Sequence, residues 1–468
     1  MRTNLILGTA IAAALTFSAP FVFVSGAFAQ DAPKSVFVHE DGTPFTADEK
    51  IELLQQELDT LKRQRDLDQE VATGAAAKTA TASLDSKGLV FSSPDGKYQF
   101  AINAQVNVDA DGFGKDGGTL QDQIQDRLIR PTFSGRAGNA SFKITPELGG
   151  TSSAAASIVD AFVEYKVSDP LQFRFGKFKS PIGLERLQAD PDVLWTERGN
   201  STNLVPNRDV GYLAFGTFAS GAVEYQVGEL DGAADTVNFN NDIDNHKDLV
   251  YRVFATPLAQ SDFVWLQGLG IGYAGTDGNH LGTTTNTQLP AYKTTGQQTF
   301  FKYNTNVFSS GKETRSNPEA YLYINNFGLL ADYVEEKQTV KLAANSAELK
   351  NKALDISGSW ILTGEAASFK GGVKPFHDFN INGSGWGAWE LTARYGYTEI
   401  DKAAFTGGYA SLSSSASKAT STGFGIGWYL SQNLKLLADV DKTKFVRGAA
   451  TGNRPDENFT SGRVQFRY

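Results

Sequence analysis

Positively charged residues near the end of the sequence alternate with apolar ones. In the last segment, GRVQFRY, Arg463 and Arg467 have one parity, and Val464, Phe466 and Tyr468 have the other. Because successive side chains of a strand point to opposite faces, this segment predicts a strand with a cationic face and an apolar face. Arginine keeps its charge at every relevant pH and offers several N–H donors to an oxyanion. Rings of such side chains in a pore select anions.

The same parity carries charged residues in other strand-like segments. The positively charged ones are Arg130, Arg136, Lys143, Arg252, Lys302 and Arg394. The acidic ones are Asp109, Glu147, Asp160, Glu164 and Glu390. Two hypotheses follow from this mixture. The cations form a pathway for anions, or they balance the carboxylates across the space that both sets line.

Few residues have the types and spacing of a catalytic or metal site. The chain has no cysteine, which excludes thiol catalysis and cysteine-based metal sites. Its four histidines, His39, His246, His280 and His377, are far apart and lack the HExxH spacing that places two metal ligands on one helix face. We expect all four in solvent-exposed loops, and we predict neither an enzyme nor a bound cofactor.

The elements that would position the charged residues are long alternating strands. In YQFAINAQVNVDA, which starts at Tyr98, apolar side chains have one parity and Gln, Asn and Asp have the other. A soluble β-sandwich and a transmembrane barrel both produce this pattern. Strands of about ten residues, aromatic residues near their ends and connections of very different length favour the barrel. We therefore predict an all-β fold, a transmembrane antiparallel β-barrel of about 16 strands over residues 88–468.

The first residues predict export. An apolar run over residues 5–24 follows Arg2, and Ala27–Ala29 has the small-x-small pattern of a cleavage site. A membrane anchor is the competing interpretation, but Pro20 and the polar sequence after the run favour a cleaved secretory signal peptide at residues 1–29. No other run of about 18 apolar residues follows, so we expect no membrane-spanning helix in the rest of the chain.

The segment at residues 30–70 differs from the barrel and is expected in the periplasm. Thr46 and Glu49 fit a capping box, which starts a helix. An apolar stripe follows at spacings of three and four residues, namely Ile51, Leu54, Leu58 and Leu61. Its two heptads predict either a solvated helix or a short coiled coil that self-associates. Residues 71–87 lack periodicity and are expected to form a linker.

The overall charge and two acidic stretches add little specific chemistry. A net charge of -9 without any Lys/Arg-rich run argues against nucleic acid as a partner. Residues 109–118 and 240–248 are rich in Asp and Asn and loosely resemble calcium loops. Both lack the ordered pattern of alternating Asp with a distal Glu that such loops have. We predict that both are polar loops at a barrel rim.

Residues 173–187, FRFGKFKSPIGLERL, resemble the strand-to-loop motif of the bacterial phosphate-selective porin O and P family. Further matching motifs follow in the family's order: ERGNSTNLVPNRDVG (197–211), LTGEAASFKGGVKP (362–375), GSGWGAWELTARY (383–395) and GFGIGWYLSQNLKLLADV (423–440). With the signal peptide, the helix and the last strand, the resemblance covers essentially the whole mature chain.

This resemblance implies an outer-membrane barrel that forms homotrimers and passes small anions such as phosphate by passive diffusion. Members with known selectivity use an inward row of arginines and a lysine-lined constriction made by loops folded into the barrel. The constriction candidates in the matching stretches are Arg174, Lys177, Lys179, Arg186, Arg198 and Arg208. Gly183 and Glu185 are expected to shape or brace the same turn.

Alternatives stay open for both the residues and the function. Arg186 and Arg198 can pair with acidic neighbours and fix the loop instead of contacting solute. The chain can be a general, non-specific porin or a structural outer-membrane protein without phosphate selectivity. Its expected partners are outer-membrane lipid and the barrel assembly machinery, to which the closing strand would present the terminal aromatic residue Tyr468.

Overall fold

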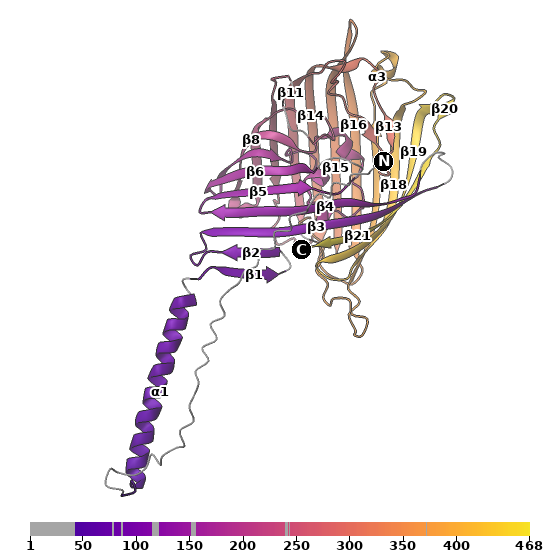
Figure 1. Cartoon of the computed structure of the whole chain (residues 1–468). Coiled ribbons are helices and arrows are strands. Elements are labelled where there is room, and N and C mark those ends of the chain that lie inside the picture. Colours follow the sequence, from indigo (N-terminus) through magenta and orange to yellow (C-terminus); the bar gives the residue numbers. More distant parts are fainter. Residues whose placement is uncertain are drawn as a thin grey trace, which may run out of the picture. The chain divides into compact units, whose positions relative to one another are not determined.

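The structure is a computed structural model of the chain (Figure 1). It describes residues 43–76, 79–85, 88–114, 121–150, 156–238, 242, 244–370 and 372–468. The signal peptide predicted for residues 1–29 lies outside the described residues. The chain forms two compact units, Met1–Ala77 and Lys78–Tyr468.

Sixteen antiparallel strands of the second unit close into a barrel. In chain order they are β3 (Tyr98–Phe113), β4 (Gln123–Ala137), β5 (Ala140–Glu147), β6 (Ser157–Ser168), β7 (Leu171–Phe178), β8 (Asp209–Phe218), β9 (Val223–Leu230), β10 (Asp248–Ala255), β11 (Leu269–Leu281), β14 (Val307–Ile324), β15 (Phe327–Leu342), β16 (Asn345–Ile361), β17 (Ala388–Glu399), β18 (Ala416–Tyr429), β19 (Leu434–Ala449) and β21 (Glu457–Arg467). We call these sixteen the wall strands. Each one pairs with the next, and the hydrogen bonds between them satisfy backbone N–H and C=O groups for which lipid offers no partner.

Shorter elements lie in the connections or extend the sheet. The strands are β1 (Thr81–Asp85), β2 (Gly88–Ser92), β12 (Tyr292–Lys293), β13 (Thr299–Phe301) and β20 (Gly452–Asn453). The helices are α2 (Leu184–Leu187), α3 (Lys402–Thr406), η2 (Asp190–Asp192), η3 (Asn200–Leu204), η4 (Ala219–Gly221) and η5 (Val264–Leu266). The hairpin of β12 and β13 forms a separate two-stranded sheet.

The last strand closes the barrel against the first. β21 pairs with the second half of β3, where Phe466 is opposite Val106. The terminal residue continues this pairing, because Tyr468 and Ala104 exchange two backbone hydrogen bonds of 2.9 Å. β2 pairs with the first half of β3, and β1 pairs with β2. The predicted barrel and its closing strand are confirmed.

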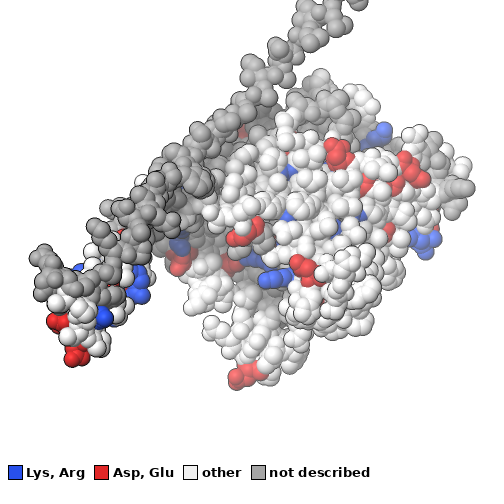
Figure 2. All heavy atoms as spheres, turned by 60° about the horizontal axis from the view of Figure 1, so that its bottom comes forward, with Lys and Arg blue, Asp and Glu red and all other residues white. Residues whose placement is uncertain are grey.

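Alternation along the wall strands separates an apolar outer face from a polar inner face. On β21, Arg463 and Gln465 are buried, whereas Val464 and Phe466 keep 49% and 45% of their surface exposed. Seen as spheres from one side, the described surface is mostly uncharged (Figure 2). Lipid requires such a face, because a Lys or Arg pointing at the bilayer near its midplane costs about 2–4 kcal/mol.

The first unit contains the helix α1, which spans Ala47–Ala76. Its start has the predicted capping box: the N–H of Thr46 donates to Glu49 Oε2 at 2.8 Å, and the N–H of Glu49 donates to Thr46 Oγ1 at 3.4 Å. The predicted apolar stripe is exposed along its length. The helix continues past residue 70, because the following sequence is rich in alanine, the strongest helix former.

Part of the expected linker at residues 71–87 is therefore ordered structure. Its first residues belong to α1, and Thr81–Asp85 form β1. Among the described residues, no helix is both long enough and apolar enough to cross a membrane.

Candidate anion pathway in the lumen

The connection between β7 and β8, residues 179–208, enters the barrel and crosses it. We call it the crossing loop. Its backbone N–H groups donate to side chains on the opposite wall: Gly183 to Asn317 on β14 at 2.7 Å, and Ser201 to Asp355 on β16 at 2.5 Å. Each buried N–H therefore has an acceptor, and the bond to the carboxylate of Asp355 is of the strong, charge-assisted kind. These anchors fix the loop inside the lumen.

The sequence of the crossing loop explains this path. Gly183 has a φ of 84°, which side chains disfavour, and a Cβ there would lie 3.1 Å from Val205. Ile182 and Leu204 are fully buried and pack in one apolar cluster with residues of the wall and the β12–β13 hairpin. Glu185 accepts a 2.8 Å hydrogen bond from the N–H of Gly199 and so braces the two limbs of the loop.

Two other connections fill the lumen beside the crossing loop. The β12–β13 hairpin is joined to it by Asn203, whose side chain accepts from the N–H of Lys293 at 2.9 Å and donates to its carbonyl at 2.8 Å. The connection between β16 and β17 contributes Phe369, whose carbonyl accepts from Gln188 at 3.4 Å and whose ring stacks on Tyr321.

Three cavities follow one another in the lumen. Their volumes are about 530, 290 and 490 Å³. Arg130 lines all three, Arg127 and Glu197 are common to the first two, and Asp190 and Arg208 are common to the last two. These shared walls make the cavities one candidate route through the barrel, which we call the lumenal pathway. The 290 Å³ space is its central cavity.

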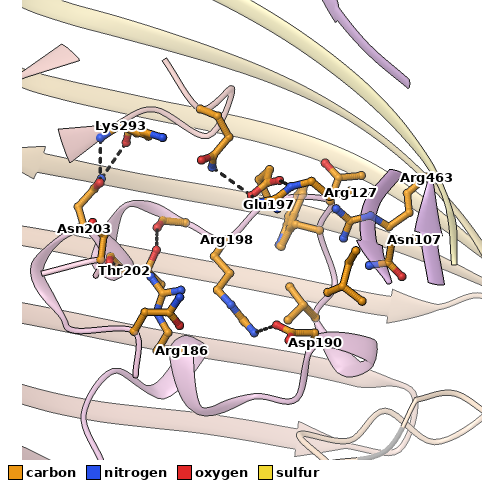
Figure 3. A pocket seen from close by; sticks show the side chains of 18 of the residues that line it. Asn107, Arg127, Arg186, Asp190, Glu197, Arg198, Thr202, Asn203, Lys293 and Arg463 are labelled. Carbon is orange, nitrogen blue, oxygen red and sulfur yellow. Dashed lines mark hydrogen bonds and ion pairs between the residues drawn. The ribbon is translucent and has the colours of Figure 1, made fainter. Parts of the chain in front are cut away.

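Basic residues outnumber acidic ones around the central cavity (Figure 3). Among the described residues, the acidic ones that line it are Asp190 and Glu197. Its basic residues are Arg127, Arg130, Arg186, Arg198, Arg208, Lys293 and Arg463. The crossing loop, the hairpin and the barrel wall all contribute to this set. An excess of fixed cations in a narrow, partly desolvated space attracts anions and repels cations.

Most of these cations are neutralised by a carboxylate. Arg127 pairs with Glu197 at 2.5 Å, and Arg463 pairs with Asp109 at 2.6 Å. Arg130 contacts both Glu147 and Asp190. Arg198 is 2.6 Å from Asp190, and Arg208 is 3.3 Å from Asp160. The second of the two sequence hypotheses, charge balance inside the barrel, therefore describes most of the arginines.

Arg186 and Lys293 differ from the others. Among the described residues, neither has a carboxylate partner within ion-pair distance. Arg186 donates to the carbonyl of Thr202 at 3.0 Å, while its Nε is buried without an acceptor. Burial, together with Arg198 and Arg208, lowers the pKa of Arg186 to about 9, so the group remains cationic at neutral pH. An entering oxyanion would supply the acceptor that Arg186 lacks.

Asp190 stands where the central cavity meets the third cavity. Although burial opposes it, the positive charges of Arg198, Lys179 and Arg130 hold the pKa of Asp190 well below its usual range. Lys179 donates to the carbonyl of Gln188 at 2.6 Å on the same side. Asp190 thus occupies, as a carboxylate tethered to the chain, a position that is favourable for an anion.

The structure brings together some of the predicted residues and separates others. Those that line the lumenal pathway are Arg130, Lys143, Lys179, Arg186, Arg198, Arg208, Arg463 and Arg467. Those buried elsewhere inside the barrel are Lys177, Arg252 and Arg394. Arg252 pairs with Glu319 at 2.8 Å, and Arg394 pairs with Asp441 at 2.5 Å. Arg174 pairs with Glu164 at 2.6 Å and lies over the rings of Phe162, Phe178 and Phe215.

Three positions differ from the sequence expectation. Lys302 follows β13 and is exposed, outside the wall strands, because Phe300 and Phe301 before it are both buried and the segment does not alternate. Arg136 is exposed near the end of β4, where it donates to the carbonyl of Gly96 at 2.9 Å. His280 lies on β11 and is buried, although a solvent-exposed loop was expected.

Two lining cations were not predicted from the sequence. Arg127 has the outward parity relative to Arg130, but a bulge shifts the register between Asn107 and Val108 and turns it inward. Lys293 lies in a long connection with no periodicity to indicate its direction. Only the three-dimensional path of these two segments shows that they reach the lumen.

A closed barrel with a lumen narrowed by loops and lined by charges is the architecture of a porin-type channel. The sequence model of the family described as phosphate-selective porin O and P matches residues 100–468, and the chain belongs to this family. Its sequence is 22% identical over 395 residues to Porin O of Pseudomonas aeruginosa, which covers 79% of this chain and 88% of that protein. The family and the fold together place the chain in the outer membrane.

Solved structures with little sequence identity share the fold. The outer membrane channel DcaP of Acinetobacter baumannii superposes with a TM-score of 0.53 at 9% identity, covering 79% of this chain and 97% of that one. An anion-selective porin from Comamonas acidovorans gives a TM-score of 0.50 at 11% identity, covering 79% and 100%. Both comparisons support the barrel architecture.

Proposed function

We propose that the chain forms a water-filled channel for passive diffusion of small solutes, with a preference for anions that include phosphate. One observation carries this proposal: the central cavity has seven basic residues against two acidic ones. Arg186 gives it a specific binding group, because its charge is not paired and its Nε has no acceptor. The family description, which names phosphate-selective porins, supports the same choice of solute.

The arrangement of charges suits transport as well as binding. An oxyanion that enters the central cavity exchanges water for N–H donors of Arg186, Arg198 and Lys293. Asp190 competes for the donors of Arg198 and so keeps the binding weak. Conduction requires a solute to be bound firmly enough to enter and weakly enough to leave. A tethered carboxylate among arginines meets the second requirement.

The remaining parts of the chain complete the proposal. Residues 1–29 are a signal peptide that is removed, residues 30–70 lie in the periplasm and residues 88–468 form the pore. Homotrimers form in the membrane, and the exposed apolar stripe of α1 supports self-association of the helix. The partners are outer-membrane lipid and the assembly machinery, which recognises the last strand ending at Tyr468.

A general, non-specific porin is the second candidate function. The observation that favours it is the number of neutralised arginines, such as Arg394 with Asp441 and Arg252 with Glu319. A lumen with mostly paired charges can be polar without strong selectivity. The two functions differ in measurable ways, since only an uncompensated cationic constriction retains anions.

Planar-bilayer recordings of the purified full chain test the proposal. In a KCl gradient, the reversal potential should show preference for chloride, and added phosphate should reduce the chloride current as it occupies the central cavity. Preference for potassium would overturn the anion channel. Preference for chloride without any block by phosphate would remove phosphate from the proposal and favour the general porin.

A further inference from the structure

Three buried carboxylates meet beside the β12–β13 hairpin, and none of the three lines the cavities of the lumenal pathway. Asp235 comes from the connection between β9 and β10, Glu313 from β14 and Glu336 from β15. One oxygen from each lies within 4.8 Å of the others. Carboxylates do not gather in a buried space without positive charge, because their repulsion and lost hydration cost several kcal/mol.

The protein cations nearby do not balance this group. Arg315 lies 2.8 Å from Asp235 and also contacts Glu313. His280 lies 3.0 Å from a fourth buried carboxylate, Asp248, and 3.1 Å from Glu313. Even with a protonated imidazole, two basic groups face four acidic ones. With all four carboxyl groups ionised, the deficit corresponds to the charge of a divalent cation.

Glu336 provides a second, independent indication. Its Oε2 accepts hydrogen bonds from the hydroxyl of Tyr292 and from Asn351, both at 3.0 Å. Its Oε1 is buried and has no hydrogen-bond partner among the described residues. The carboxyl groups of Glu336 and Asp235 lie within hydrogen-bonding distance of each other, so either a bound cation or a shared proton must join them. A buried acceptor without a partner is costly, and a cation would satisfy it.

We infer that Asp235, Glu313 and Glu336 form a binding site for a divalent cation that prefers oxygen ligands, and that the site favours Ca²⁺ over Mg²⁺. The donors are carboxylate oxygens, which these ions prefer. Ca²⁺ takes most of its ligands from protein oxygens, whereas Mg²⁺ keeps several of its waters, so three convergent carboxylates favour Ca²⁺.

The position of this site gives the ion a structural role in the channel. It joins the β9–β10 connection to two wall strands. Through Glu336 and the hydroxyl of Tyr292, it also holds the hairpin at the residue before Lys293. Since Lys293 lines the central cavity, the ion stabilises one wall of the lumenal pathway. This inference does not depend on which solute the channel prefers.

Terbium luminescence tests the site directly. The purified full chain is treated with EDTA, freed of chelator and titrated with Tb³⁺. Tyr292 would sensitise the emission of the bound ion, because its hydroxyl is hydrogen-bonded to the ligand Glu336. We expect saturable emission with a single ion per chain, competition by Ca²⁺ and a higher unfolding temperature with Ca²⁺ than with EDTA. The variant with Asp235→Asn and Glu336→Gln should bind Tb³⁺ at least about 100-fold more weakly, since loss of even an outer-shell partner costs about 10- to 100-fold.

Glu319→Gln is the matched control. Glu319 is a buried carboxylate on β14, like Glu313, but it pairs with Arg252 outside the cluster, so this variant should keep the Tb³⁺ signal. Circular dichroism checks the folding of each variant, and Glu336→Gln alone, which keeps an acceptor for Tyr292, serves if the double variant does not fold. Absence of saturable Tb³⁺ emission and of any Ca²⁺ effect on the wild type would overturn the site and indicate a proton shared by Asp235 and Glu336. Unchanged Tb³⁺ binding in the variants would also overturn it.

Discussion

The guanidinium of Arg463 donates two hydrogen bonds to the carboxylate of Asp109, at 2.7 and 2.6 Å. The two residues are 354 positions apart in the sequence, yet they are direct partners in the pairing of β21 with β3. Both are buried on the inner face. A bidentate contact of this kind fixes geometry as well as charge. Arg463 therefore joins the last strand to the first, in addition to lining the central cavity.

Removing one member of this pair should destabilise the barrel. Asp109→Asn or Arg463→Gln alone leaves a buried charge without its partner, which costs about 3–5 kcal/mol. The double variant should lose much less than the sum, because no unpaired charge remains. Unfolding in denaturant, followed by tryptophan fluorescence, measures the three variants. Additive losses would show that the two side chains stabilise the barrel independently.

Arg186 and Arg394 should respond in opposite ways to the same substitution. Arg186→Gln removes an unpaired cation from the central cavity, so phosphate block should weaken by roughly tenfold. This factor corresponds to the loss of one charged hydrogen bond, which is worth about 1.5 kcal/mol. Stability should change little. Arg394→Gln, the matched control, leaves Asp441 unpaired and should mainly destabilise the barrel. Bilayer recordings and unfolding curves separate the two effects, and equal selectivity in both variants would contradict the assignment.

The sequence predicts the wall of this channel better than its constriction. Alternation reports which face a strand side chain takes, and so it identifies the barrel and the inward direction of Arg463. It carries no information on pairing, because Asp109 and Arg463 meet only when the cylinder closes. It fails where a bulge inserts a residue, as at Arg127, and where a connection has no period, as at Lys293 and Lys302.

The contacts of the crossing loop could not be predicted from the sequence either. Its motif indicates a turn at Gly183, but the anchors on Asn317 and Asp355 are more than a hundred residues away. Contacts at that separation depend on the whole fold. Family resemblance supplies the expectation that a loop folds inward. Only the structure shows which cations are paired with a carboxylate.

Asp190→Asn should increase the affinity of the channel for anions. The substitution removes the carboxylate that competes for Arg130 and Arg198, so phosphate should block chloride current at lower concentration and dissociate more slowly. The amide keeps the size of the side chain and limits disturbance of the loop. Noise analysis of the blocked current measures the residence time. A shorter residence time would show that Asp190 supports anion binding instead of competing with it.

The ion pairs of Asp190 should hold their part of the crossing loop until the solution is strongly acidic. The pKa of Asp190 is lower in the folded chain than its ordinary value near 3.9. Its contribution to stability is therefore complete above about pH 4 and is lost as the pH falls further toward the folded value. The part of the conductance that depends on Asp190 should be constant from neutral pH to about 4 and change below it. Asp190→Asn should remove that acid transition, and a change already present at neutral pH would contradict it.

Gly183→Ala should loosen the crossing loop. The residue has a φ of 84°, and an added Cβ would lie 3.1 Å from both Val205 and Arg186. A side chain at such a φ destabilises by about 1 kcal/mol or more. Gly221→Ala is the control, because its φ is 90° and nothing lies within 4 Å of the added Cβ, so it reports the backbone effect alone. We expect larger and noisier single-channel conductance in Gly183→Ala and wild-type conductance in Gly221→Ala. Equal conductance in both variants would show that the turn at Gly183 does not position the constriction.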